Sequence, residues 1–447
     1  MIILQVICSS LLVIMSGLLM DRVCRISKVI QPTILGIAYL SFILMHYIPS
    51  LFFLADSSMT ESANYLWACT LALLTMSVGG AYVNLITQFK SKYISIYYRK
   101  LVKTIPTKKD IVFVFAFGIL CGLISIIYIT DVSVYPLYLL LAGKVSTLTV
   151  NAMRREVQGS NMGSSFWYIY GIARVFLMPL LFTLIIALWS KFKGFCQKSF
   201  ALLLLITVFI YNSWSAAKTP IAMLFLNASI AELIYLSNSK IIKFKNTIIL
   251  NRKTVKILIG IALSFFVMVS YPIFIFKFKD FGADKDVLHI FYEGVLKRIM
   301  FKPAFLAYFQ FEMFPDLFEF TYFSDIQKLA SLFDIEYVDL SSLTAETAFD
   351  ADSNAPPAAV GNFYAQAGWT MVVVGFFLIG FLLQGIQVWV IQYAPKSPIT
   401  VAILAILCYG SFRLSMASFH TVFLSEAIIP SIIFIVLWKL YRRLKFT

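Results

Sequence analysis

Charged side chains are scarce in this chain of 447 residues. Asp, Glu, Lys and Arg make up 13% of it, whereas 60% is hydrophobic and the mean hydropathy is +0.86. A soluble domain carries about twice that share of charge. So much apolar side chain cannot be hidden in a water-soluble core. The composition therefore argues against a soluble enzyme, a disordered protein or a fibrous repeat, and it predicts a polytopic membrane protein.

Residues that form disulfides, metal sites or nucleotide sites are also few. No two of the six cysteines bracket a polar loop, so we expect neither disulfides nor zinc. The three histidines have no metal-ligand spacing, and none is followed closely by a carboxylate. That pattern argues against a metalloprotease and against histidine-based acyl transfer. Gly143-Lys144 lacks the upstream glycine of a phosphate-binding loop, so we expect no nucleotide-driven pump, no cofactor and no metal.

Apolar runs long enough to cross a membrane are what the sequence does contain. A spanning helix needs roughly 20 mostly apolar residues, and about eleven such runs can be read. They lie near 2–20, 29–54, 64–88, 111–130, 166–189, 200–217, 220–237, 255–276, 368–391, 399–418 and 421–439. We therefore predict an all-α protein with membrane helices over 1–276, a large structured loop over 277–367 and further membrane helices over 368–447.

The net charge of +15 indicates membrane topology rather than nucleic-acid binding. Of the 37 Lys and Arg residues, 24 lie in or next to alternate connectors, above all in Lys90–Lys109 and Lys240–Lys256. Cytoplasmic connectors of membrane proteins collect basic residues. We therefore expect these stretches and the C-terminus in the cytoplasm, and the N-terminus and the large loop outside.

The large loop holds seven basic and fourteen acidic residues, and long loops in compact proteins usually carry function. Its apolar spacing predicts an amphipathic helix over Asp284–Met300. An aromatic stretch, including Tyr308, follows over 303–320, either as a platform for sugar rings or as packing against the membrane domain. We expect Ser324 to cap a helix over 325–334, and 336–360 to be a mobile strap.

Cations within or outside the membrane are the candidate binding residues. Arg174 and Arg413 interrupt apolar runs, where a charge is costly and usually faces an internal cavity. The outer cations are Arg154, Arg155, Lys218, Arg298 and Lys302. For each, snorkelling or a structural ion pair is the alternative. Fixed cations beside apolar walls suit an anion carried on a lipid, such as a polyprenyl diphosphate.

Glu293 and Glu312 are the candidate proton acceptors, because they flank Arg298 in the part of the loop that reads as helical. A continuous helix would place cations, rings and a carboxylate on one face: Arg298, Lys302, Phe305, Phe309 and Glu312. Pro303 argues that such a helix breaks. Both glutamates are otherwise explained as solvated loop residues.

Three passages resemble a known family. They are Arg154 through Pro179, then Arg298-Ile-Met-Phe-Lys-Pro-Ala with Tyr308-Phe-Gln-Phe-Glu-Met-Phe-Pro315, and finally Asn362-Phe-Tyr-Ala-Gln-Ala-Gly-Trp369. With the large loop, this organisation is similar to that of the O-antigen and capsule repeat-unit polymerases of the Wzy type. These are multi-pass proteins of the bacterial inner membrane with one large periplasmic loop, and they are related in architecture to glycosyltransferases of the GT-C type.

The resemblance implies an activity and its partners. Such enzymes transfer a growing glycan from undecaprenyl diphosphate to the non-reducing end of an incoming lipid-linked oligosaccharide unit. The donor bond is already activated, so no nucleotide and no metal is needed. The implied partners are the undecaprenyl-diphosphate-linked oligosaccharide, membrane lipid and a chain-length regulator, with no nucleic acid.

Two other functions remain open. An O-antigen ligase would rely on a histidine in the large loop, where His289 is the one candidate. A flippase or other transporter for lipid-linked oligosaccharides predicts short loops and charges through the membrane midplane, which the long loop over 277–367 fits poorly.

Overall fold

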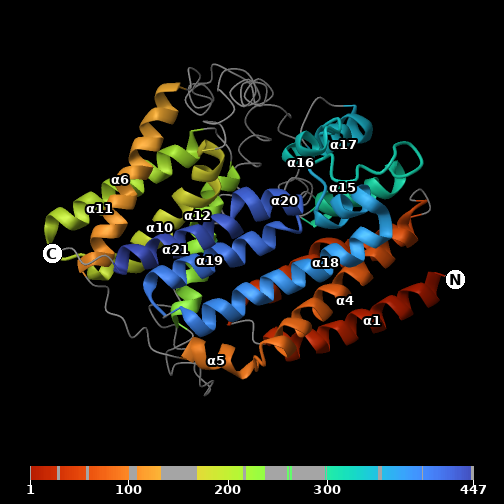
Figure 1. The fold of residues 1–447 in the computed structure, drawn as a ribbon, viewed down its shortest axis with the longest axis horizontal. Helices are drawn as coiled ribbons and strands as arrows, with labels where there is room; N and C mark the ends of the chain where they lie inside the picture. Colours follow the sequence, from red (N-terminus) through yellow and green to blue (C-terminus); the bar gives the residue numbers. More distant parts are fainter. Residues whose placement is uncertain are drawn as a thin grey trace, which may run out of the picture. The chain divides into compact units, whose positions relative to one another are not determined.

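The computed structural model describes residues 2–27, 31–56, 60–99, 108–131, 169–214, 218–236, 259–260, 262–263, 297, 300–350, 355–394 and 396–443. All regular secondary structure in these residues is helical (Figure 1). In this described part of the chain, eight helical segments are long and apolar enough to cross a membrane: Ile2–Cys24, Ile34–Ala55, Ser62–Ile86, Lys108–Thr130, Ile169–Leu188, Gly194–Ser213, Ala359–Tyr393 and Phe419–Tyr441. The chain is therefore a multi-pass membrane protein.

Two shorter apolar helices, Pro220–Ile234 and Pro398–Arg413, coincide with two more of the predicted runs. The predicted run 255–276 lies almost wholly outside the described residues. The described helices thus match the positions of ten predicted runs, and the total number of spans stays a prediction.

The chain divides into two compact units. Unit 1 contains residues 1–97, 296–394 and 410–423, and unit 2 contains 98–295, 395–409 and 424–447. The described part of the large loop thus belongs to the same unit as the first membrane helices. The units cut across the three segments that the sequence suggested, because packing joins segments that are far apart in the chain.

Unit 1 is built on the contact between α4 (Ser62–Ile86) and α18 (Ala359–Tyr393). A Cβ atom added at Gly79 of α4 would lie 2.1 Å from the carbonyl oxygen of Phe377, and one added at Gly380 of α18 would lie 2.0 Å from that of Met76. Both distances are too short for any side chain. In lipid, helices associate by close packing rather than by the hydrophobic effect, and small residues permit it. These two glycines let the backbones touch.

The two ends of unit 1 differ (Figure 1). At one end lie the N-terminus of α1 (Ile2–Cys24), the start of α4 and the loop helix α15 (Lys302–Met313), whose Tyr308 ring lies 6.0 Å from that of Tyr65. At the other end, Arg25 donates to Ser95 of α5 (Lys92–Arg99) over 3.0 Å. We call these the loop side and the basic side. Their separation agrees with opposite membrane faces for the described part of the loop and for Lys90 and Lys92, which begin the basic stretch.

Labelling of introduced cysteines tests the orientation. In a chain whose native cysteines are replaced, an impermeant thiol reagent should label Glu346→Cys, but not Lys92→Cys, in cells with a permeabilised outer membrane. Both side chains are exposed, so burial does not bias the comparison. The reverse pattern would place the loop in the cytoplasm.

From residue 300 on, the described part of the loop contains more helix than the sequence suggested. The predicted mobile strap over 336–360 is wrong, because it contains α17 (Leu340–Phe349) and the start of α18. The Asp339 carboxylate caps α17 by accepting from the backbone N–H groups of Ser341 and Ser342 at 3.0 and 3.2 Å. The predicted cap at Ser324 is also wrong, since α16 (Gln327–Phe333) begins later and has Ile326 as its N-cap.

Unit 2 contains α6 (Lys108–Asp131), the π-helical turn η2 (Ala173–Leu177) with α10 (Met178–Leu188), α11 (Gly194–Ser213), α12 (Lys218–Leu236) and α21 (Ile428–Arg443). α10 packs against α12, and α6 against α11. The helix α19 (Pro398–Arg413) carries the chain from unit 2 into unit 1.

Candidate functional site

The turn after α19 lies inside unit 1 rather than on its surface. The carbonyl oxygen of Ser415 is 2.8 Å from Nε2 of His46, which lies nine residues before the end of the helical segment Ile34–Ala55. That is roughly 13 Å along a helix axis. Irregular backbone at membrane depth is tolerated only where protein or a cavity surrounds it. The turn is therefore enclosed by protein, in the interior of unit 1 toward its loop side.

His46 holds the turn in place. A carbonyl oxygen only accepts, so Nε2 carries the proton, and Nδ1 accepts from the Tyr65 hydroxyl at 2.8 Å. Both nitrogens are thus satisfied within a fully buried ring. His46 has a structural role, and it joins the second membrane segment, α4 and the turn.

The kink of α18 creates a binding site for the backbone of the large loop. Gly368 has φ +60° and ψ −145°, and Ala367 is also non-helical, so the first segment of α18 ends there. Only glycine adopts this conformation readily. A helix end leaves carbonyl oxygens without helical donors. Those of Ala365 and Gln366 accept from the backbone N–H groups of Thr321 and Tyr322 over 2.9 and 3.0 Å.

This strand-like contact brings Asp325 of the loop against α18. Its carboxylate is 1% exposed and accepts from Asn362 Nδ2 over 2.6 Å. Gln366 Nε2 lies 3.1 and 3.2 Å from the two carboxylate oxygens. Two amide donors one turn apart on α18 thus hold a buried carboxylate, which would otherwise be costly to bury.

His420 faces the same carboxylate. It lies on α20 (Phe419–Thr421), and its Nδ1 is 3.8 Å from Asp325 Oδ2. Its side chain is 23% exposed, so the ring is partly open while Nδ1 is buried. This pair is not apparent from the sequence, because 95 residues separate Asp325 from His420 and no carboxylate closely follows the histidine. The sequence holds only a weak indication of this site: the amide side chains of Asn362 and Gln366 lie one helical turn apart, shortly before Gly368.

α15 presents a mixed face to the outside of unit 1. Lys302 is exposed and Phe305, Phe309 and Glu312 are half-buried, at positions three, seven and ten residues further on. Pro303 sits in the first turn of α15, directly after the π-helical residues 300 and 301, so the predicted break at Pro303 is wrong. The predicted alignment of a cation, rings and a carboxylate therefore holds from Lys302 onward. Arg298 lies outside the described residues.

Tyr308 lies beside this face of α15, one turn before Glu312, and is 1% exposed. Its hydroxyl donates to the Glu312 carboxylate in a short hydrogen bond. Burial, and then this hydrogen bond, raise the pKa of Tyr308, so the phenol keeps its proton. Its ring packs against Phe53 and Tyr65. The pair anchors the loop on the membrane helices, and the roles of Tyr308 in substrate binding and of Glu312 as proton acceptor stay predictions.

The intramembrane arginines lie in different units. Arg413 ends α19 in unit 1 and is half-buried, directly before the internal turn. Arg174 lies on η2 in unit 2, close enough to the hydroxyl groups of Tyr128 and Tyr211 to interact electrostatically. These two tyrosine rings are 4.9 Å apart. Both arginines are half-buried, and their facing an internal cavity stays a prediction.

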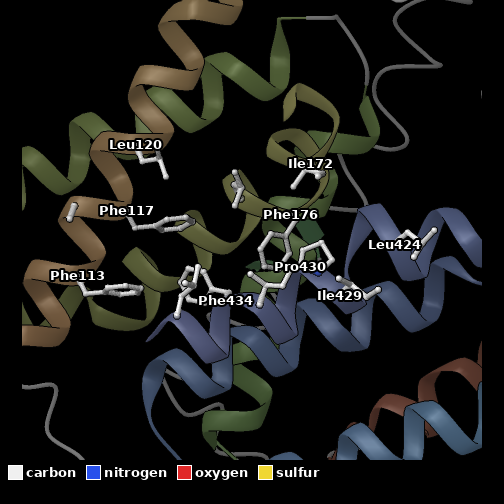
Figure 2. Close-up of a pocket in the computed structure, with 13 residues that line it drawn as sticks. Phe113, Phe117, Leu120, Ile172, Phe176, Leu424, Ile429, Pro430 and Phe434 are labelled. Atoms are coloured by element: carbon white, nitrogen blue, oxygen red, sulfur yellow. The ribbon is translucent and has the colours of Figure 1, made fainter. Parts of the chain in front are cut away.

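An apolar cavity of about 470 Å³ lies in unit 2 beside η2 (Figure 2). Its walls come from α6, η2 and α21, with rings such as Phe117, Phe176 and Phe434 turned toward it. Phe176 and Leu177 of the wall share the single turn η2 with Arg174. A cavity of this size is within the range of ligand sites.

The remaining predicted site residues are not placed. Glu293, Arg154, Arg155 and Arg298 lie outside the described residues, and Lys218 begins α12 with a side chain that is not described. Among the described residues, no three His, Cys, Asp or Glu side chains gather as a metal site requires. Comparison of the chain with protein-family models, curated proteins and solved structures found no match.

Proposed function

We propose that this protein polymerises lipid-linked oligosaccharide repeat units, of O-antigen or capsule, on the periplasmic side of the bacterial inner membrane. The growing glycan is transferred from undecaprenyl diphosphate to the non-reducing end of an incoming lipid-linked unit. In this proposal the N-terminus is periplasmic and the C-terminus cytoplasmic.

One observation carries the proposal: the large loop folds onto the loop side of the membrane helices and shares a buried polar centre with them. Asp325 of the loop meets Asn362 and Gln366 of α18 and His420. Buried charge at a membrane helix end, beside irregular backbone, usually serves a ligand. A glycan on a membrane anchor has to be handled at such a boundary between loop and bilayer.

Further features suit the two parts of the substrate. The face of α15 with Lys302, Phe305, Phe309 and Glu312 combines aromatic rings with hydrogen-bonding groups, as sugar rings require. The apolar cavity beside Arg174 suits an isoprenoid chain, with the arginine fork near a diphosphate. In both cases the support is that the chemical character of the protein surface suits that part of the substrate.

Deletion of the gene in its host separates this function from the nearest alternative. Loss of a polymerase should leave single repeat units that still reach their final acceptor. Loss of a ligase would instead leave long chains on the lipid carrier, and that result would refute the proposal.

A further inference from the structure

We propose that His420 is the general base that takes the proton from the attacking sugar hydroxyl, with Asp325 as its positioning residue. This inference rests on the proposed function and deepens it. It replaces Glu312, which is already engaged by Tyr308, as the proton acceptor in the described part of the chain.

The geometry fixes the roles of the two histidine nitrogens. Nδ1 is the buried nitrogen and faces Asp325 Oδ2 at 3.8 Å. A neighbouring carboxylate favours the proton on the nitrogen that faces it, so the lone pair lies on Nε2. The distance is longer than a hydrogen bond, and a closure of about 1 Å on substrate binding would complete it, as catalytic contacts in empty sites often require.

The Asp325 carboxylate is built to orient an imidazole rather than to act on substrate itself. It is 1% exposed, and Asn362 and Gln366 hold both of its oxygens. Among the described residues, Asp325 is the charged group in contact with His420, and the two α18 side chains that bind the same carboxylate, Asn362 and Gln366, are neutral. A fixed buried carboxylate stabilises the imidazolium that forms when the base takes its proton.

A second observation points to a ligand at this centre. The amide nitrogens of Asn362 and Gln366 must face the carboxylate, because a carboxylate only accepts. Their oxygens, Oδ1 and Oε1, are buried and have no hydrogen-bond partner among the described residues. A buried acceptor without a donor is destabilising, because it has lost its hydrogen bonds to water. Hydroxyl groups of a sugar are donors of the required kind.

The step balances without any further reactant. The acceptor hydroxyl oxygen forms a bond to the anomeric carbon of the growing chain while the bond from that carbon to the diphosphate oxygen breaks. The electron pair leaves with the lipid diphosphate. Nε2 of His420 takes the hydroxyl proton, and the imidazolium later releases it to water.

Steady-state kinetics of the purified full-length protein in lipid vesicles test the assignment, with the single lipid-linked unit as substrate. His420→Gln should lower kcat by about 100-fold or more with little change in KM. Only neutral histidine accepts a proton, so the wild-type kcat should fall as the pH drops through the histidine range, and the variant should lose this dependence. Asp325→Asn should also lower kcat strongly and move the acidic limb of the pH profile to lower pH, because the imidazolium loses its neighbouring carboxylate. Glu336→Gln, an exposed carboxylate of the same loop, is the matched control and should behave as wild type.

Three outcomes would overturn the assignment. One is a folded His420→Gln variant with wild-type kcat and pH profile. The second is a Glu312→Gln variant that abolishes the acidic limb while His420→Gln keeps it. The third needs no variant: a wild-type kcat that does not change with pH through the histidine range. A wild-type protein that makes no polymer at all would instead refute the proposed function.

Discussion

Replacing Gly380 by alanine should destabilise unit 1, although alanine is the better helix former. The new Cβ atom would lie 2.0 Å from the Met76 carbonyl oxygen, which belongs to backbone and cannot turn away. α4 and α18 must therefore separate along their contact. Overpacking of this kind costs about 1–3 kcal/mol, and a leucine at the same position should prevent folding. Thermal unfolding of the purified protein in detergent measures the loss.

Gly385 supplies the matched control in the same helix. A Cβ atom there would have no heavy atom of another part of the structure within 4 Å. Gly385→Ala should therefore show only the gain in helix propensity, up to about 1 kcal/mol. We therefore expect Gly380→Ala to lower the thermal stability and Gly385→Ala to raise it. Equal effects would mean that α4 and α18 do not touch at Gly380.

Arg174 and Arg413 are each replaced by alanine. The variant that loses the contact with the diphosphate leaving group should make polymer about 100-fold more slowly or worse, because that contact strengthens as negative charge develops on the diphosphate. Arg→Lys keeps the charge but loses the planar fork, so it should already impair synthesis to a smaller extent. Polymer formed per unit of inserted protein is the measurement.

Arg22 is the control for charge. It lies in the last turn of α1 on the basic side and is exposed, so Arg22→Ala removes one positive charge far from the loop side. Its polymer should be normal. If the alanine variants of both Arg174 and Arg413 insert normally and still make long polymer, these arginines have no role in substrate binding.

The membrane spans were predictable, because each depends on local composition over about 20 residues. The eight long helices follow the apolar runs closely, although α18 begins at Ala359 and not near 368. The early start reflects packing: Gly361 lies against Ala307 of α15, which makes room for a buried first segment. A hydropathy window does not contain that contact.

The centre at Asp325 was not predictable in the same way. His420 and Asp325 meet only because the kink at Gly368 frees the carbonyl oxygens of Ala365 and Gln366, to which the loop binds. Likewise, α17 was missed because small and acidic residues suggested mobility, whereas Asp339 supplies a cap. In both cases one side chain or one backbone angle decides the structure, and average composition conceals it.

Lengthening of a lipid-linked unit by the purified protein tests the central proposal most directly. The protein is placed in lipid vesicles with the single undecaprenyl-diphosphate-linked unit, without nucleotide, and the products are separated by size. We expect a ladder of chains that grow by whole repeat units, with one undecaprenyl diphosphate released for each unit joined. Movement of the unit across the vesicle membrane with no increase in glycan length would contradict the proposal and indicate a transporter.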